Sequence, residues 1–270
     1  MTDGPQRSPR DADELVHLDL DAGVATVTLD SPANRNALSR RLVSDLHRAF
    51  DGADAAVASG DVRSIVLTHT PPAFCAGADL KERASGPTDS SPVVAAFERL
   101  IDAPVPTIAA VSGPARAGGI GLMASCDLVV VRRDVSFALT EVRIGVAAAM
   151  ISVPIFRRVY PAHLASALLT GEPFTAETAR QVGLVTHVTD DVVDVVDRLC
   201  ADISRGAPAA VAATKRILRD ALDEPTGERA ARFERMRVLS DELFQSADAA
   251  EGMAAFAEKR PPAWQLRSGG

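Results

Sequence analysis

The stretch from residue 107 to residue 131 places the strongest constraint on the fold, because strand, turn, helix and strand patterns follow one another within it. Residues 107–111 (TIAAV) and 128–131 (LVVV) are short apolar runs that are typical of buried strands. Between them, Gly118, Gly119 and Gly121 open an apolar segment that indicates a helix starting at a tight turn. Short strands that alternate with helices predict the α/β class, in which strand ends lead ligands to helix N-termini.

The same alternation extends to both sides of this stretch. Residues 16–20 and 24–29 largely alternate apolar with polar side chains around Asp21-Ala22-Gly23, which predicts a β-hairpin. Ser39 is a typical N-cap for a helix whose apolar side chains fall on one face. Residues 84–92 are rich in Ser, Pro, Gly and Asp and therefore indicate a mobile loop. We also expect strands at residues 64–68 and 184–188 and a helix at residues 93–101.

After residue 188 the pattern becomes almost entirely helical. The expected helices cover residues 191–204, 208–222, 227–244 and 248–259. We therefore predict three regions: a disordered tail at residues 1–12, an α/β core at residues 13–200 and a helical C-terminal region at residues 201–270. The last region is expected to dock on the core or to form oligomer contacts.

Composition excludes several classes of protein. The net charge is −7 and the chain has one Trp and one Tyr, whereas nucleic-acid binding needs a basic surface and stacking aromatic rings. No segment approaches the ~18 apolar residues of a membrane span. Residues 1–10 have no apolar core of a signal peptide. We expect no nucleic-acid partner and no membrane partner.

The cysteines and histidines carry no metal or redox signature. Cys75, Cys126 and Cys200 lack CxxC spacing, and we expect three reduced thiols in a cytoplasmic protein. The five histidines stand singly, without neighbouring cysteines or carboxylates at metal-ligand spacing. No metal site is predicted, and Cys75 has no histidine partner in sequence that would support covalent catalysis.

Two glycine-containing turns follow predicted strands, at residues 75–81 (CAGADLK) and 117–119 (AGG). A helix N-terminus presents unsatisfied N–H donors and a partial positive charge. Two such donors that converge on one carbonyl oxygen would form an oxyanion hole. Glycine after a strand can equally mark only a tight turn, so both interpretations stay open at this point.

Four stretches match one family in order and spacing: residues 29–38, 73–82, 106–127 and 137–145, with a weaker fifth match at residues 256–262. From about residue 12 to its C-terminus the chain resembles the crotonase, or enoyl-CoA hydratase/isomerase, superfamily. The resemblance implies a ClpP-like fold, in which ββα turns repeat as a superhelix. It also implies a C-terminal helical region used in trimer formation, and hence a homotrimer or a dimer of trimers.

The resemblance further implies that the substrate is an acyl-CoA thioester, whose coenzyme A is part of the substrate and not a separate cofactor. By position, the N–H groups of Ala78 and Gly118 would hold the thioester oxygen and stabilise an enolate. Arg35 and Lys259 are candidate phosphate partners, although either could be a solvated surface charge. The remaining substrate-binding positions implied by the match are Ala76, Asp79, Leu80 and Lys81.

The acid–base residues match the family unevenly. Family hydratases use two glutamates, and the later one corresponds to Glu141. The earlier one falls on Gly121, so that acid/base position is vacant. Asp127 belongs to a Cys-Asp pair that recurs in the family independently of the missing glutamate, and we expect its role to be structural.

Three functions remain open. The chain could be an enoyl-CoA hydratase in which Glu141 acts without the usual partner, or a double-bond isomerase in which Glu141 alone shuttles a proton. It could also be a non-catalytic acyl-CoA-binding homologue. The loop at residues 142–152 is similar to methylglutaconyl-CoA and related branched-substrate hydratases. If the missing carboxylate limits hydration, Gly121→Glu should raise the activity. Thioester hydrolysis would need a nucleophile that the sequence does not offer.

Overall fold

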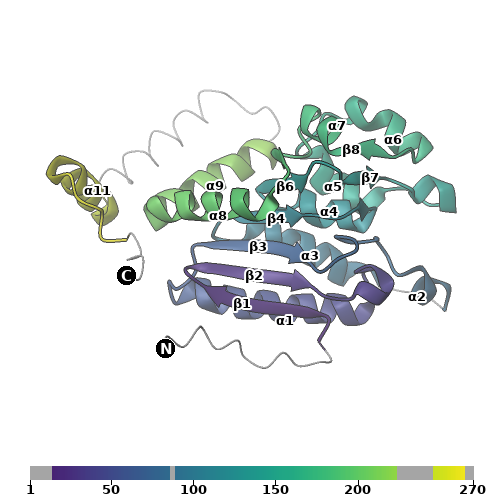
Figure 1. Ribbon diagram of the computed structural model, residues 1–270, viewed down its shortest axis with the longest axis horizontal. Helices are drawn as coiled ribbons and strands as arrows, with labels where there is room; N and C mark the ends of the chain where they lie inside the picture. Colours follow the sequence, from purple (N-terminus) through teal and green to yellow (C-terminus); the bar gives the residue numbers. More distant parts are fainter. Residues whose placement is uncertain (1–13, 86–88, 224–245, 265–270) are drawn as a thin grey trace.

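The computed structural model describes residues 14–85, 89–223 and 246–264 of this chain (Figure 1). Six strands form the main sheet in the order β1-β2-β3-β4-β6-β9, and three more form a small sheet in the order β5-β7-β8. In the main sheet β1 and β2 are antiparallel, and each later pair is parallel. The strands are β1 (Val16–Asp21), β2 (Val24–Leu29), β3 (Ser64–His69), β4 (Thr107–Val111), β5 (Ala115–Arg116), β6 (Leu128–Arg132), β7 (Ser136–Ala138), β8 (Phe174–Thr175) and β9 (His187–Thr189).

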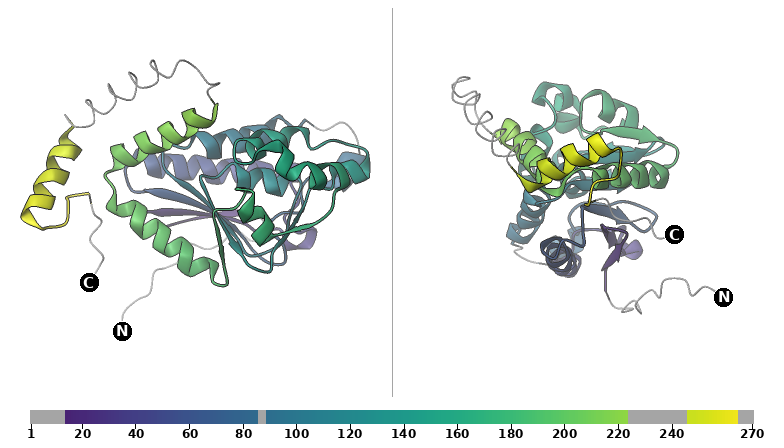
Figure 2. Two further views of the ribbon diagram at one scale, coloured as in Figure 1. Left: turned by 90° about the horizontal axis from the view of Figure 1, so that it is seen from above. Right: turned by 90° about the vertical axis from the view of Figure 1, so that its left-hand side faces the viewer.

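The main sheet lies between two helical layers (Figure 2). Helices α1 (Arg40–Ala58) and α3 (Ser91–Asp102) cover one face, and α8 (Val192–Arg205) covers the other. The strand side chains alternate between these layers, as the period of a strand requires. In β3, Ile65 and Leu67 belong to the larger apolar cluster under α1 and α3, whereas Val66 packs in the smaller cluster with α8.

The remaining helices gather at two ends of the molecule. Helices α4 and α5 contact each other near the small sheet, whereas α11 lies at the opposite end of the molecule (Figure 1). The bounds of these and the other helical segments are η1 (Pro32–Asn34), α2 (Leu80–Ala84), α4 (Gly118–Ala124), η2 (Glu141–Ile144), α5 (Ala149–Phe156), η3 (Pro161–Leu164), α6 (Ala165–Thr170), α7 (Ala176–Gln181), α9 (Pro208–Asp223) and α11 (Ala247–Glu258).

Most of the expected elements form where the pattern places them. The hairpin is β1–β2, and the Ser39 hydroxyl accepts a hydrogen bond from the Leu42 N–H at 3.2 Å as the N-cap of α1. The strand expected at residues 184–188 is wrong in position. Leu184 and Val185 lie in the turn after α7, and their N–H groups donate to the carbonyl of Ala179 within that helix. The hydrogen bonds to β6 begin at the Thr186 N–H, which donates to the Val129 carbonyl at 3.0 Å, and the ladder itself begins at β9.

Two other expectations, the tail and one C-terminal helix, fall on residues that the structure does not describe. Residues 1–12 and 227–244 lie outside the described residues. The predicted division after residue 200 falls inside α8, and the division into core and C-terminal region stays a prediction. Within the described ranges, no helix combines the length and the apolarity that crossing a membrane would require.

Candidate active site

A pocket of about 410 Å³ brings together five of the predicted site residues. Its walls are formed by four segments: α2, the face of α3 that carries Val93 and Phe97, the start of α4, and the segment from η2 to α5. The predicted residues that line it are Ala76, Ala78, Leu80, Gly118 and Glu141.

Short pairings between the turns explain why these residues meet. Cys75 bridges Ala115 in parallel, and Arg116 pairs with Ala138 in the β5–β7 ladder. Parallel segments leave a ladder at the same edge. Three segments therefore leave the ladders side by side: the turn before α2, the start of α4 and the start of η2. Glu141 follows three residues after Ala138, the strand residue that pairs with Arg116.

The first turn requires glycine at position 77. Gly77 has φ +88°, and a Cβ built on it would lie 2.8 Å from the Ala117 Cβ and 3.1 Å from the Arg116 carbonyl oxygen. The turn is fixed from the other side as well. The Leu38 N–H donates to the Gly77 carbonyl at 2.7 Å, and the Ala76 N–H donates to the Arg35 carbonyl at 3.0 Å.

The second turn holds a strained residue. Ala117 has φ +46° and ψ −117°, a conformation that L-residues rarely adopt and that costs about 1–3 kcal/mol. The next residues pack tightly against the first turn. A Cβ on Gly118 would lie 2.7 Å from Leu38 Cδ1, and one on Gly119 would lie 2.6 Å from the Cys75 carbonyl oxygen. Strain at such a junction is typical of a functional site.

Ala78 and Gly118 have N–H groups without an acceptor in the part of the chain that the structure describes. Both residues line the pocket, and an ideal Cβ on Gly118 would lie 3.7 Å from Gly77 Cα, so the two turns are in contact. Both residues are partly exposed, so their amides are accessible from the pocket. Two unpaired donors at one pocket can stabilise a negative oxygen there.

Glu141 provides the carboxylate of the pocket. It begins η2 and is half-buried, and its Oε2 is buried without a hydrogen-bond partner. Burial raises the pKa of the Glu141 carboxyl group above its ordinary value. An unpaired carboxylate oxygen in a pocket is costly to the fold and is a mark of an acid–base group.

The position next to Gly121 is filled by apolar side chains. A Cβ built on Gly121 would lie 2.7 Å from Phe97 Cζ and 2.8 Å from Ile151 Cγ2. Phe97 and Ile151 are each only 3% exposed, and both line the pocket. Glu141 is the sole acidic side chain among the described lining residues. Gly121 thus lacks a carboxylate, and Phe97 and Ile151 leave no room for one. We therefore no longer expect Gly121→Glu to raise the activity.

Four predicted binding residues lie outside this pocket. Asp79 caps α2, where its Oδ1 accepts from the Lys81 N–H at 3.0 Å, and Arg35 and Lys81 are exposed. Lys259 directly follows α11, at the end of the molecule opposite α4 (Figure 1). The C-terminal segment is fixed there by Trp264, whose Nε1 donates to the Arg205 carbonyl at 3.1 Å. One copy of the chain therefore does not bring Lys259 to the pocket.

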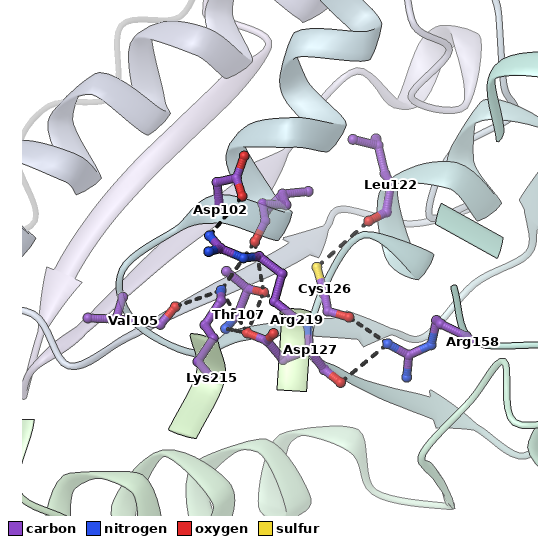
Figure 3. Close-up of polar contacts among 10 residues, drawn as sticks. Asp102, Val105, Thr107, Leu122, Cys126, Asp127, Arg158, Lys215 and Arg219 are labelled. Carbon is purple, nitrogen blue, oxygen red and sulfur yellow. Dashed lines mark hydrogen bonds and ion pairs between the residues drawn. The ribbon is translucent and has the colours of Figure 1, made fainter. Parts of the chain in front are cut away.

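Asp127 has the structural role that its sequence context predicts (Figure 3). Its Oδ2 lies 2.8 Å from Lys215 Nζ and accepts hydrogen bonds from the N–H and hydroxyl of Thr107 at 2.8 and 3.0 Å. Lys215 also donates to the Leu100 and Val105 carbonyls. These contacts join α9 to the chain between α4 and β6. The partner Lys215 was not predicted, because it is one of several charged residues on α9.

The cysteines are free and buried. Burial raises the pKa of the Cys75 thiol to about 12, so it stays protonated and unreactive beside the pocket. Among the described residues, no group of His, Cys, Asp and Glu could hold a metal ion. Glu141 and the two backbone amides are the groups of this pocket that could act on a bound substrate.

Fold and pocket together define a class: an α/β protein that can hold an oxyanion between two backbone amides beside one carboxylate. The Enoyl-CoA hydratase/isomerase family profile matches residues 19–267. A putative enoyl-CoA hydratase of Thermus thermophilus is 36% identical over 249 residues, which cover 88% of this chain and 96% of that protein. Enoyl-CoA hydratase EchA19 of Mycobacterium tuberculosis is 35% identical over 252 residues, which cover 89% and 92%.

Solved structures agree with these relatives. An enoyl-CoA hydratase of Mycobacterium smegmatis matches with a TM-score of 0.85 and 31% identity, over 93% of this chain and 99% of that one. The chain belongs to the enoyl-CoA hydratase/isomerase, or crotonase, superfamily and is an enzyme of that family. The predicted resemblance and the predicted α/β crotonase fold are confirmed.

Proposed function

We propose that this enzyme adds water across the double bond of a 2-enoyl-CoA, with Glu141 as its single acid–base residue. The observation that carries the proposal is the unpartnered, buried Oε2 of Glu141 in the same pocket as the unpaired N–H groups of Ala78 and Gly118. A thioester oxygen between those amides would place the carbons of the double bond within the same pocket as the carboxylate.

The reaction then needs two proton transfers. The ionised Glu141 takes a proton from water while the water oxygen bonds to C3, and the electron pair of the double bond moves to the thioester oxygen. Ala78 and Gly118 stabilise this enolate, each by about 3–4 kcal/mol of barrier. Glu141 returns the proton to C2, which restores the carbonyl group and leaves a 3-hydroxyacyl-CoA. A positioned acid–base group contributes about 10²–10⁴-fold.

Isomerisation of a 3-enoyl-CoA to a 2-enoyl-CoA is the second candidate. The observation in its favour is the apolar wall of Phe97 and Ile151, which offers no second carboxylate to hold a water molecule. Glu141 would take a proton from C2, the amides would hold the dienolate, and Glu141 would return the proton at C4. This route needs no activated water.

Binding of coenzyme A and assembly belong to the same proposal. Leu80 and Ala76 would line the path of the pantetheine arm, and Asp79, Lys81 and Arg35 would bind nearer the nucleotide. Since one copy does not bring Lys259 to the pocket, we propose that a neighbouring copy supplies it in a homotrimer or a dimer of trimers. The helical region at residues 201–270 would form those contacts, in a cytoplasmic protein.

The absorbance of the conjugated thioester tests the reaction type. A hydratase removes this absorbance when it is mixed with a 2-enoyl-CoA, whereas an isomerase creates it from a 3-enoyl-CoA. Binding of a saturated acyl-CoA, measured by calorimetry, identifies a non-catalytic homologue if neither change occurs. Loss of absorbance with formation of 3-hydroxyacyl-CoA supports hydration, and its absence across chain lengths contradicts it.

A further inference from the structure

His69 is the last residue of β3, and both nitrogens of its ring have backbone partners. Nδ1 lies 3.1 Å from the carbonyl oxygen of Thr70, and Nε2 lies 3.0 Å from the backbone nitrogen of Ser112. A carbonyl oxygen only accepts and an amide N–H only donates, so Nδ1 carries the proton and Nε2 is the acceptor. The proposed acid–base step of Glu141 does not use this ring.

The bond between His69 and Ser112 joins the two segments that lead to the oxyanion amides. Residues 70–78 run from the end of β3 to Ala78, and residues 112–118 run from the end of β4 to Gly118. Both segments leave the same edge of the main sheet, because β3 and β4 are parallel neighbours. The side chain of His69 therefore links the two segments where they leave their strands.

Backbone hydrogen bonds then continue the link toward the pocket. The Phe74 N–H donates to the Pro114 carbonyl at 3.0 Å, and the Arg116 N–H donates to the Cys75 carbonyl at 2.9 Å. The bond of His69 comes first in this series along both segments. A shift of residues 112–114 at that first link would therefore be passed on to the turns that carry Ala78 and Gly118.

Close packing fixes the ring in the form that this bond requires. The rings of His69 and Phe74 meet edge to face, with 5.5 Å between their centroids, and a Cβ built on Gly113 would lie 3.0 Å from His69 Cε1. Burial lowers the pKa of His69, and the nearby charge of Arg132 acts in the same direction. The neutral ring therefore predominates at pH 7. A protonated ring would direct a second donor at the Ser112 N–H.

We propose that His69 is a positioning residue, which holds the Ala78 and Gly118 amides at the separation that a thioester oxygen requires. The proposal rests on the function given above for these amides. His69 is not among the described residues that line the pocket, so it acts through the two turns. Preorganised donors stabilise the transition state only where their geometry fits the developing charge. Loss of the acceptor should therefore slow hydration more than it weakens binding.

Three variants separate the acceptor from the ring. His69→Phe keeps a ring beside Phe74 and removes the acceptor, whereas His69→Gln can place an amide oxygen near the position of Nε2. His187→Phe is the matched control, because His187 is also half-buried at the end of a main-sheet strand, and its Nδ1 lies 3.0 Å from the Thr186 hydroxyl. If His69→Phe does not fold, His69→Asn takes its place, since its amide is too short to reach Ser112.

We expect kcat for a 2-enoyl-CoA to fall about 10–100-fold in His69→Phe, with less than about threefold change in KM. His69→Gln should stay within about threefold of the wild type in kcat. His187→Phe should behave as the wild type. An unchanged kcat in His69→Phe would overturn the proposal. An equal loss in His69→Gln would overturn it too, because the ring and not the acceptor would then be the cause.

The carbonyl stretching frequency of a bound saturated acyl-CoA, measured by infrared spectroscopy with an isotope-labelled thioester, tests the positions of the amides without turnover. Hydrogen bonds from both amides should lower this frequency in the wild type and in His69→Gln, whereas His69→Phe should return it toward the value of the free ester. A lowered frequency that His69→Phe leaves unchanged would overturn the role of His69 alone. A wild type without any lowering would contradict the proposed function of Ala78 and Gly118 as well.

Discussion

At the scale of the residue, the raised pKa of Glu141 predicts that the proposed hydration is sensitive to acid. Burial favours the protonated carboxyl group, whereas hydration needs the ionised form as the base. We therefore expect kcat/KM to fall as the pH decreases, with a midpoint above the ordinary glutamate value of about 4.3. A pH profile of the free enzyme measures this midpoint. A midpoint at or below the ordinary value would contradict the role of burial.

The wall next to Gly121 gives a second prediction at this scale. Gly121→Ala adds a methyl group within 2.8 Å of both Phe97 and Ile151, and overpacking of this kind destabilises a protein by about 1–3 kcal/mol. Phe97→Leu removes the ring carbon that the methyl group meets, so the double variant should be more stable than the sum of the single changes. Urea unfolding measures the cycle. Additive effects would show that the two positions do not touch.

Single residues also show the limit of sequence reasoning at this site. Gly77, Gly118 and Glu141 could be predicted because their turns carry a recognisable local pattern. Phe97 and Arg83 carry no such pattern, since an apolar residue on a helix face or an arginine on a short helix has many uses. The place of Phe97 follows from the packing of α3 over α4, a contact between distant segments, whereas Arg83 on α2 is held by its hydrogen bond to Ser90.

At the scale of the element, the ion pair of Lys215 and Asp127 fixes α9 to the segment after α4. Lys215 is 7% exposed and the Asp127 side chain is 28% exposed, so Lys215→Met leaves a partly buried carboxylate without its cation. Breaking a buried pair costs about 3–5 kcal/mol, and the partial exposure of Asp127 lowers the expected cost here to about 2 kcal/mol. The exposed pair of Arg205 and Asp202 is the control, and Arg205→Met should cost less than about 1 kcal/mol. Equal losses in urea unfolding would contradict this account.

Element boundaries were predicted less well than element types. The expected β-strand at residues 184–188 is displaced to β9 (His187–Thr189), since Leu184 and Val185 are buried in the turn that follows α7. Apolar character indicates burial in a strand and burial in a turn equally well. Only the hydrogen bonds to Ala179, which depend on the course of α7, distinguish the two.

At the scale of the whole molecule, the position of α11 separates Lys259 from the pocket of its own chain. If a neighbouring copy supplies Lys259, Lys259→Ala should raise KM for CoA esters. The fold of the variant should stay unchanged. Glu141→Gln subunits keep Lys259, whereas Lys259→Ala subunits keep Glu141. Co-assembled subunits of the two kinds should therefore regain some sites of low KM. A Lys259→Ala variant with unchanged KM would contradict this arrangement.

The α/β architecture of the whole molecule could be predicted from local patterns, because short apolar strands alternate with helices along the sequence. The distance between Lys259 and Glu141 could not. It depends on the position of α11, which lies at the end of the molecule opposite α4 (Figure 1) and which no short motif encodes.

The rate of hydration by Glu141→Gln tests the central claim most directly. Glutamine keeps the size of the side chain, removes the base and leaves the Ala78 and Gly118 amides in place. We predict that a 2-enoyl-CoA still binds, as shown by calorimetry with its saturated analogue, and that its conjugated absorbance disappears about 10²–10⁴-fold more slowly than with the wild type. A variant that binds the ester and hydrates it at the wild-type rate would show that Glu141 is not the acid–base residue.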